Sequence, residues 1–135
     1  MRVVLDTNVF VSGVFFSGPP ARILEAWRDG KIVPVLSPSI LEEYRRVGEE
    51  LARRYQGVEL GPFLSLLVAS GEVVADRALN EPVSRDPDDD KFTSCAVEAG
   101  ARVVVSGDQD LLEVGDWQGV AVMSPRGFVD QYLSG

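Results

Sequence analysis

The chain has 135 residues, the size of one compact domain, and its 45% hydrophobic and 25% charged residues exclude global disorder. It contains no histidine and a single cysteine, Cys95, which excludes histidine-dependent catalysis, histidine-ligated metal sites, an intrachain disulfide and a cysteine metal cage. The 21 acidic residues outnumber the 13 Lys and Arg, giving a net charge of −8, and leave the oxygen ligands that hard divalent cations prefer.

The acidic balance does not by itself exclude a nucleic-acid partner, although such partners are usually met by basic surfaces. Two divalent ions held by the acids would bring four positive charges to the region that a polyanion approaches and would change the net charge from −8 to −4. The apolar run 3–5 before Asp6 is too short for a leader or a membrane span. We therefore expect a cytoplasmic protein with no membrane partner.

Strands and helices are predicted to alternate along the chain. Short β-branched runs predict strands at 3–5, 32–36 and 103–105, with weaker candidates at 73–74 and 120–122. Helical patterns cover about 21–28, 38–55, 62–69, 87–99 and 125–133. This alternation predicts an α/β fold with a mostly parallel central sheet and helices on both faces, and the absence of repeats predicts one domain over residues 1–135.

Two helix starts are encoded by a capping residue followed by proline. Ser37-Pro38 is one, and Asp86-Pro87 is the other, with further acids in the first turn. The helix that begins at Asp86-Pro87 is expected to end at Gly100.

Two acids lie just after predicted parallel strands. Asp6 comes after 3–5, and Asp108 follows 103–105 by way of Ser106 and Gly107. Ligands of open parallel sheets bind at the carboxyl ends of strands, which makes both acids candidate site residues. The alternative is that each only caps a following helix or turn.

Helical periodicity selects a third acid on the long helix. Its apolar stripe is formed by Ile40, Tyr44, Val47 and Leu51. At ~100° per residue, Glu43 lies ~70° from the centre of this stripe and can reach inward, whereas Glu42 falls on the opposite, solvated side. Glu43 could equally be a flanking surface residue.

Helical periodicity also reduces the candidate acids near Pro87 from three to two. The buried face of that helix is expected to include Phe92, Cys95, Ala96 and Ala99. Asp88 and Asp89 lean toward this face and Asp90 points away. The alternative is that the run 86–90 only compensates the helix dipole.

A cluster of such carboxylates is costly unless a divalent cation lies among them. Magnesium held by carboxylates can activate water and bind a phosphoryl oxygen, so phosphodiester hydrolysis needs no histidine.

The motifs, taken in order, resemble the PIN domain family from Met1 to about Tyr132. They are Leu5-Asp6-Thr7-Asn8, Glu43 within Ile40-Leu41-Glu42-Glu43-Tyr44, Asp86-Pro87-Asp88-Asp89-Asp90-Lys91-Phe92, and Val105-Ser106-Gly107-Asp108-Gln109-Asp110-Leu111. The resemblance implies a three-layer α/β/α sandwich and a metal-dependent ribonuclease similar to the VapC-like toxins of bacterial toxin–antitoxin pairs.

The resemblance also implies the site residues. The catalytic ligands of Mg²⁺ or Mn²⁺ would be Asp6, Glu43, Asp89 and Asp108. Asp89 is preferred to Asp88 because its spacing to Gly100 fits the family better. The auxiliary residues would be Asn8, Ser106 and Asp110, the first two orienting carboxylates or water.

The expected substrate is single-stranded RNA, and the expected partner is a cognate antitoxin protein. The alternative is a PIN-like module that binds RNA or protein without cutting it, which the presence of all four acids disfavours. An aspartyl-phosphate phosphatase would need a second acid where Asn8 stands. A receiver domain would need an acid pair and a late lysine, yet the only lysines are Lys31 and Lys91.

Arginines and aromatic residues offer weaker signals. The arginines on the long helix are Arg45, Arg46, Arg53 and Arg54, which could guide a phosphate backbone or, as we favour, pair with Glu42, Glu49 and Glu50. Trp27 and Trp117 are interpreted as core or interface residues. A homodimer could use apolar contacts of Phe10, Val14, Phe15 and Phe16, which could equally belong to the core.

Overall fold

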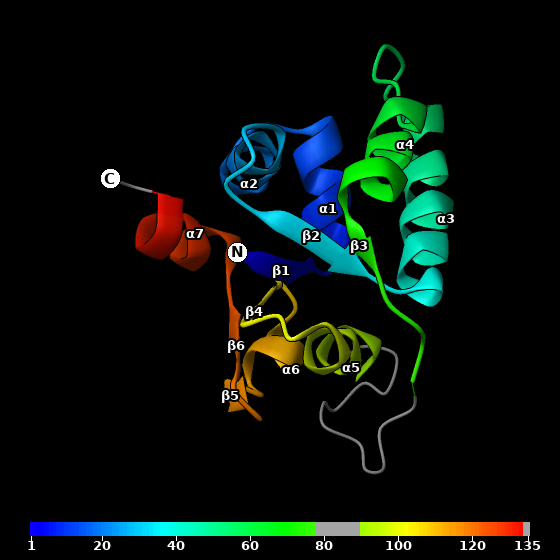
Figure 1. Ribbon diagram of the computed structural model, residues 1–135. Coiled ribbons are helices and arrows are strands. Elements are labelled where there is room, and N and C mark those ends of the chain that lie inside the picture. Colours follow the sequence, from blue (N-terminus) through cyan, green and yellow to red (C-terminus); the bar gives the residue numbers. More distant parts are fainter. Residues whose placement is uncertain (78–89, 134–135) are drawn as a thin grey trace.

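The computed structural model describes residues 1–77 and 90–133 (Figure 1). Its elements, in chain order, are β1 (Arg2–Leu5), α1 (Thr7–Phe15), α2 (Pro19–Arg28), β2 (Val33–Leu36), α3 (Pro38–Arg54), α4 (Gly61–Ser70), β3 (Glu72–Val73), α5 (Asp90–Ala99), β4 (Val103–Val105), α6 (Gln109–Leu112), β5 (Asp116–Trp117), β6 (Val120–Met123), α7 (Pro125–Phe128) and a π-helical turn, Val129–Leu133.

The strands form one six-stranded sheet in the order β3-β2-β1-β4-β6-β5. All neighbouring pairs are parallel except β5 and β6. In Figure 1, α1 to α4 lie on one side of the sheet and α5 and α6 on the other. The predicted α/β fold with a mostly parallel sheet between helical layers is confirmed.

The central strands are covered on both faces, which explains their continuous β-branched sequences. Val3 and Val4 of β1 and all three valines of β4 are fully buried. The apolar stripe of α3 packs inward through Ile40 and Tyr44, both almost fully buried.

Most predicted helix boundaries agree with the structure within two residues. Ser37 caps α3, because its hydroxyl accepts a hydrogen bond from the backbone N–H of Ile40 at 3.4 Å. Gly100 ends α5 in the left-handed conformation, with φ 68°. The predicted helix start at 86–89 lies outside the described residues.

The sequence predicts β6 as a weak strand candidate at 120–122 but gives no sign of β5, so the β5–β6 hairpin was missed. Its turn consists of Gln118 and Gly119, with φ of 49° and 82°. Two central residues with positive φ are typical of tight hairpin turns, where Asn-Gly is the recognisable signal and Gln-Gly is not.

Strand register aligns the ends that carry the candidate acids. Leu5 of β1 pairs with Val105 of β4, which pairs with Met123 of β6. The chain order of the strands reverses between β1 and β4, and such a reversal opens a crevice at the carboxyl ends of the strands. In residues 1–77 and 90–133, no helix is long and apolar enough to cross a membrane.

Candidate active site

Asp6 lies at the carboxyl end of β1, and only 4% of it is exposed. Its backbone N–H continues the parallel ladder by donating to the carbonyl of Val105 at 3.0 Å. One carboxylate oxygen, Oδ1, caps α1 by accepting from the N–H of Val9 at 2.8 Å. The other oxygen, Oδ2, accepts a short hydrogen bond from the hydroxyl of Ser106.

Ser106 connects Asp6 to Asp108. The fully buried Ser106 hydroxyl donates to Asp6 and accepts from the backbone N–H of Asp108 at 2.9 Å. Asp108 caps α6 with its Oδ1, which accepts from the N–H groups of Asp110 and Leu111 at 2.8 and 3.3 Å. No described residue hydrogen-bonds the other oxygen of Asp108, so this oxygen is available to a ligand.

Capping and a shared site are therefore compatible for these two acids. The capping alternative considered from the sequence is correct for both Asp6 and Asp108. Each uses one oxygen for the cap, and the two side chains are nevertheless joined through one hydroxyl group.

The charge of Asp6 is unfavourable in the chain by itself. Burial raises the pKa of the Asp6 carboxyl, and the negative charge of Asp108 raises it further, against the lowering effect of the hydrogen bonds from Ser106 and Val9. A buried carboxylate beside a second carboxylate is relieved by a cation. The chemistry of this pair thus fits a divalent metal ion.

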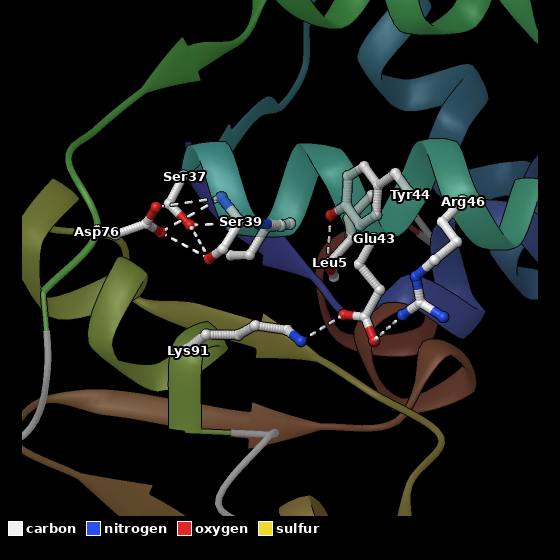
Figure 2. Close-up of polar contacts among 9 residues, drawn as sticks. Leu5, Ser37, Ser39, Glu43, Tyr44, Arg46, Asp76 and Lys91 are labelled. Atoms are coloured by element: carbon white, nitrogen blue, oxygen red, sulfur yellow. Dashed lines mark hydrogen bonds and ion pairs between the residues drawn. The ribbon is translucent and has the colours of Figure 1, made fainter.

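Glu43 is placed near the end of β1 by its neighbour Tyr44. The Tyr44 hydroxyl donates a short hydrogen bond to the carbonyl of Leu5, the residue before Asp6 (Figure 2). The Tyr44 ring also stacks on Phe10 of α1, with centroids 4.3 Å apart. Burial raises the pKa of Tyr44, and the negative charges of Asp6 and Glu43 contribute to this rise, so both carboxylates lie within electrostatic reach of the phenol.

The Glu43 carboxylate itself contacts two cationic side chains. Figure 2 shows Lys91 extending from α5 to Glu43, with Nζ 2.7 Å from Oε2. Arg46 lies 4.0 Å from the other oxygen, Oε1. Oε2 is buried and has no hydrogen bond of good geometry, so its charge is met chiefly by the Lys91 ammonium group. Glu42, as predicted, is exposed, and it pairs with Arg45.

The structure brings together some of the predicted ligands. Asp6 and Asp108 are connected through Ser106, whereas Glu43 contacts Lys91. Asp88 and Asp89 lie outside the described residues. Within the ranges that are described, no three acids or cysteines are close enough to hold a metal ion.

The auxiliary residues differ in their surroundings. Asn8 is exposed on the first turn of α1. Asp110 is half-buried at the start of α6, and its backbone N–H donates to Asp108. Asp90, expected to point away from the site, is the first residue of α5 and is half-buried.

Two further residues at the site carried no independent signal in the sequence. Lys91 belongs to the run 86–92, in which no sequence pattern distinguishes it from an ordinary surface lysine. Thr7 follows Asp6, and its hydroxyl is buried without a hydrogen-bond partner among the described residues. The motif Leu5-Asp6-Thr7-Asn8 contains Thr7, yet only the tertiary structure shows that the hydroxyl is buried.

The arginines of α3 divide into two groups. Arg45 pairs with Glu42 and Glu49, as favoured from the sequence. Arg53 and Arg54 are exposed and form no ion pair with any described residue.

Some of the apolar residues that could belong to the core are buried in the structure, and others are exposed. Trp27 is buried, and its indole N–H donates to Ser70. Phe10 and Val14 are also buried, whereas Phe16 is 43% exposed and packs edge-on against Tyr55. A cavity of about 360 Å³ between α1, α2 and α4 has mainly apolar walls, such as Leu24 and Phe63, and includes none of the predicted site residues.

The chain is similar in sequence and in fold to known proteins. The chain is 34% identical over 145 residues to the uncharacterized protein MJ1680 of Methanocaldococcus jannaschii, covering 98% of this chain and 92% of that protein. Its fold resembles the crystal structure of PAE2754 from Pyrobaculum aerophilum, with a TM-score of 0.61, 16% identity, and coverage of 99% of this chain and 90% of that one. The profile of the PIN domain matches residues 2–110. By this match the chain belongs to the PIN domain family, whose members are generally nucleases that use divalent metals.

Proposed function

We propose that this protein is a divalent-metal-dependent ribonuclease that hydrolyses phosphodiester bonds of single-stranded RNA. The observation that carries the proposal is the Asp6–Ser106–Asp108 arrangement at the strand-order reversal of a PIN domain. The two carboxylates lie where ligands of open parallel sheets bind, and their mutual repulsion favours a cation between them.

The metal ligands in this proposal are Asp6, Glu43, Asp89 and Asp108. A bound Mg²⁺ or Mn²⁺ would supply an activated water and neutralise charge on the phosphate. The protein contributes orientation: Ser106 fixes one oxygen of Asp6, and Tyr44 fixes the turn of α3 that carries Glu43.

The test is cleavage of a labelled single-stranded RNA. Wild-type protein should cleave with Mg²⁺ or Mn²⁺ and stop on addition of chelator. Asp6→Asn should lower the rate by at least about a hundredfold, because a ligand charge is lost while the side chain keeps its shape. The matched control is Asp116→Asn, which removes an equal charge at an exposed acid of β5 and should leave the rate unchanged.

Two results would contradict the proposal. Undiminished cleavage by Asp6→Asn would show that the proposed metal site takes no part in the reaction. RNA binding without cleavage in either metal would favour the alternative, a PIN-like binding module.

The biological setting is a further part of the proposal. The similarity to VapC-like toxins, seen in the sequence motifs, supports a cytoplasmic toxin that is inhibited by a cognate antitoxin protein. Growth arrest on expression, relieved by the product of a neighbouring gene, would support the toxin role.

Self-association is also proposed, with exposed Phe16 and Tyr55 as contact residues. Light scattering of the purified protein would detect a homodimer.

A further inference from the structure

Lys91 is a cation built into an acidic site, and the proposed reaction gives it no role. It is the second residue of α5, and its Nζ lies 2.7 Å from Oε2 of Glu43 on α3. The ion pair therefore joins two helices that lie on opposite sides of the sheet (Figures 1 and 2). The only other lysine of the chain, Lys31, is exposed before β2, near the amino end of that strand.

This ion pair differs from the surface pairs of the molecule in its burial. The side chains of Lys91 and Glu43 are 26% and 23% exposed, whereas those of Arg45 and Glu42 are 45% and 59% exposed. Charges that are largely removed from water are screened less and interact more strongly. The Lys91 ammonium group also lies 5.4 Å from the centroid of the buried Phe92 ring, which adds a favourable cation–π contact.

Lys91 contacts the oxygen of Glu43 that has no other positively charged neighbour among the described residues. Oε2 of Glu43 is buried and has no hydrogen bond of good geometry, so its charge depends on Lys91. Arg46 approaches only the other oxygen, at 4.0 Å, and its side chain is 66% exposed. Removal of Lys91 would leave a half-buried carboxylate in need of another positive partner.

We propose that Lys91 is a resident counter-ion that competes with the divalent cation for Glu43. It balances the charge of Glu43 in the metal-free protein, and its ammonium group moves away from Oε2 when Glu43 turns to the metal. A lysine suits this exchange because its charge sits at the end of a flexible four-carbon stem. The inference rests on the proposed function, because it requires that Glu43 contribute to a metal site.

The experiment is calorimetric titration of the metal-free protein with Mn²⁺ at fixed pH and ionic strength. Lys91→Met should bind Mn²⁺ roughly three- to tenfold more tightly than wild type, because the competing charge is gone. Lys31→Met is the matched control: it changes the net charge equally but away from the site, and it should match wild type. Lys91→Arg, which keeps the charge, should stay close to wild type.

A second comparison ties the effect to Glu43 itself. In a Glu43→Gln background, Lys91→Met should change Mn²⁺ affinity no more than Lys31→Met does. Circular dichroism of each variant in chelator checks folding, and Lys91→Gln replaces Lys91→Met if the latter is unfolded.

The outcomes separate the two proposals. Equal affinities for Lys91→Met and Lys31→Met, with measurable binding by wild type, would overturn the competition and leave the metal site intact. Weaker binding by Lys91→Met would also overturn it, since the lysine would then assist the metal. Absence of Mn²⁺ binding in wild type and all variants would overturn the proposed function and this inference together.

Discussion

Asp6 serves the fold and the candidate site with different oxygens. Oδ1 caps α1, and Oδ2 accepts the Ser106 hydroxyl group. The cap fixes the rotation of the carboxylate, and Ser106 ties it to the strand that carries Asp108. Neither contact removes the electrostatic cost of a buried charge beside another acid, which is why the pKa of Asp6 is raised.

This raised pKa predicts how the stability of the metal-free protein depends on pH. The native state holds the Asp6 proton more tightly than the unfolded state, whose carboxyl titrates near 3.8. The contribution of Asp6 to the free energy of unfolding is therefore largest at low pH. It declines as the pH rises through the interval between 3.8 and the raised native value, and stays low above it.

Asp6→Asn should remove this decline. Relative to wild type, its free energy of unfolding in chelator should increase as the pH rises from about 3.5 to 7, because the variant lacks the carboxyl whose pKa is raised in the native state. Urea titrations at several pH values measure it, with Asp116→Asn as the exposed control. A wild-type protein whose Asp6-dependent stability grows with pH would contradict the raised pKa.

At the scale of residues, the sequence located acids better than their partners. Asp6 and Asp108 are predicted because they lie within three residues of the ends of strands, and Glu43 because helical periodicity separates it from Glu42. The pairing of Glu43 with Lys91 joins α3 and α5, so it depends on tertiary packing that no local pattern encodes.

At the scale of elements, Gly13 controls how closely α1 approaches α2. A Cβ atom at Gly13 would lie 2.7 Å from the Leu24 side chain and 2.8 Å from the backbone oxygen of Pro20. The Leu24 side chain can adjust, but the backbone of Pro20 can move only with its helix. The small residue is thus required by packing, although glycine is unfavourable inside a helix.

Gly13→Ala should lower the free energy of unfolding by roughly 1–3 kcal/mol, the usual cost of overpacking. Gly61→Ala is the matched control, because a Cβ atom there meets open space at the start of α4. The control should be neutral or stabilising by a few tenths of a kcal/mol, since alanine restricts the unfolded chain. Thermal or urea unfolding compares them, and equal stability of both variants would show that α1 and α2 separate without cost.

The long helix α3 has strong local signals and was predicted closely, whereas β5 and α6 were missed. The prediction for α3 ended within one residue of the observed end because Ser37-Pro38 marks its start and a long apolar stripe marks its face. The two-residue strand β5 and the four-residue helix α6 are too short to show a periodicity. Their structure is set by the turn at Gln118 and by capping from Asp108.

At the scale of the whole molecule, strand order gathers residues that are a hundred positions apart. β1 and β4 are neighbours and end in register, so Asp6 and Ser106 meet at one edge of the sheet. The sequence predicts this edge because Asp6 and Asp108 lie just after strands that are expected to be parallel. Asp89 lies outside the described residues. Among the residues that are described, Glu43 contacts a lysine rather than another acid, and no sequence motif predicts this contact.

The most direct test of the shared metal site is a crystal structure of the protein with Mn²⁺, using the anomalous signal to locate the ion. The account predicts Mn²⁺ between Asp6 and Asp108, with carboxylate oxygens at roughly 2.0–2.3 Å. Asp89 and Glu43 should bind it directly or through one water, and Lys91 should no longer contact Oε2 of Glu43. A saturated crystal with no Mn²⁺ at this edge of the sheet, or with the ion bound elsewhere and Glu43 still paired with Lys91, would contradict the account.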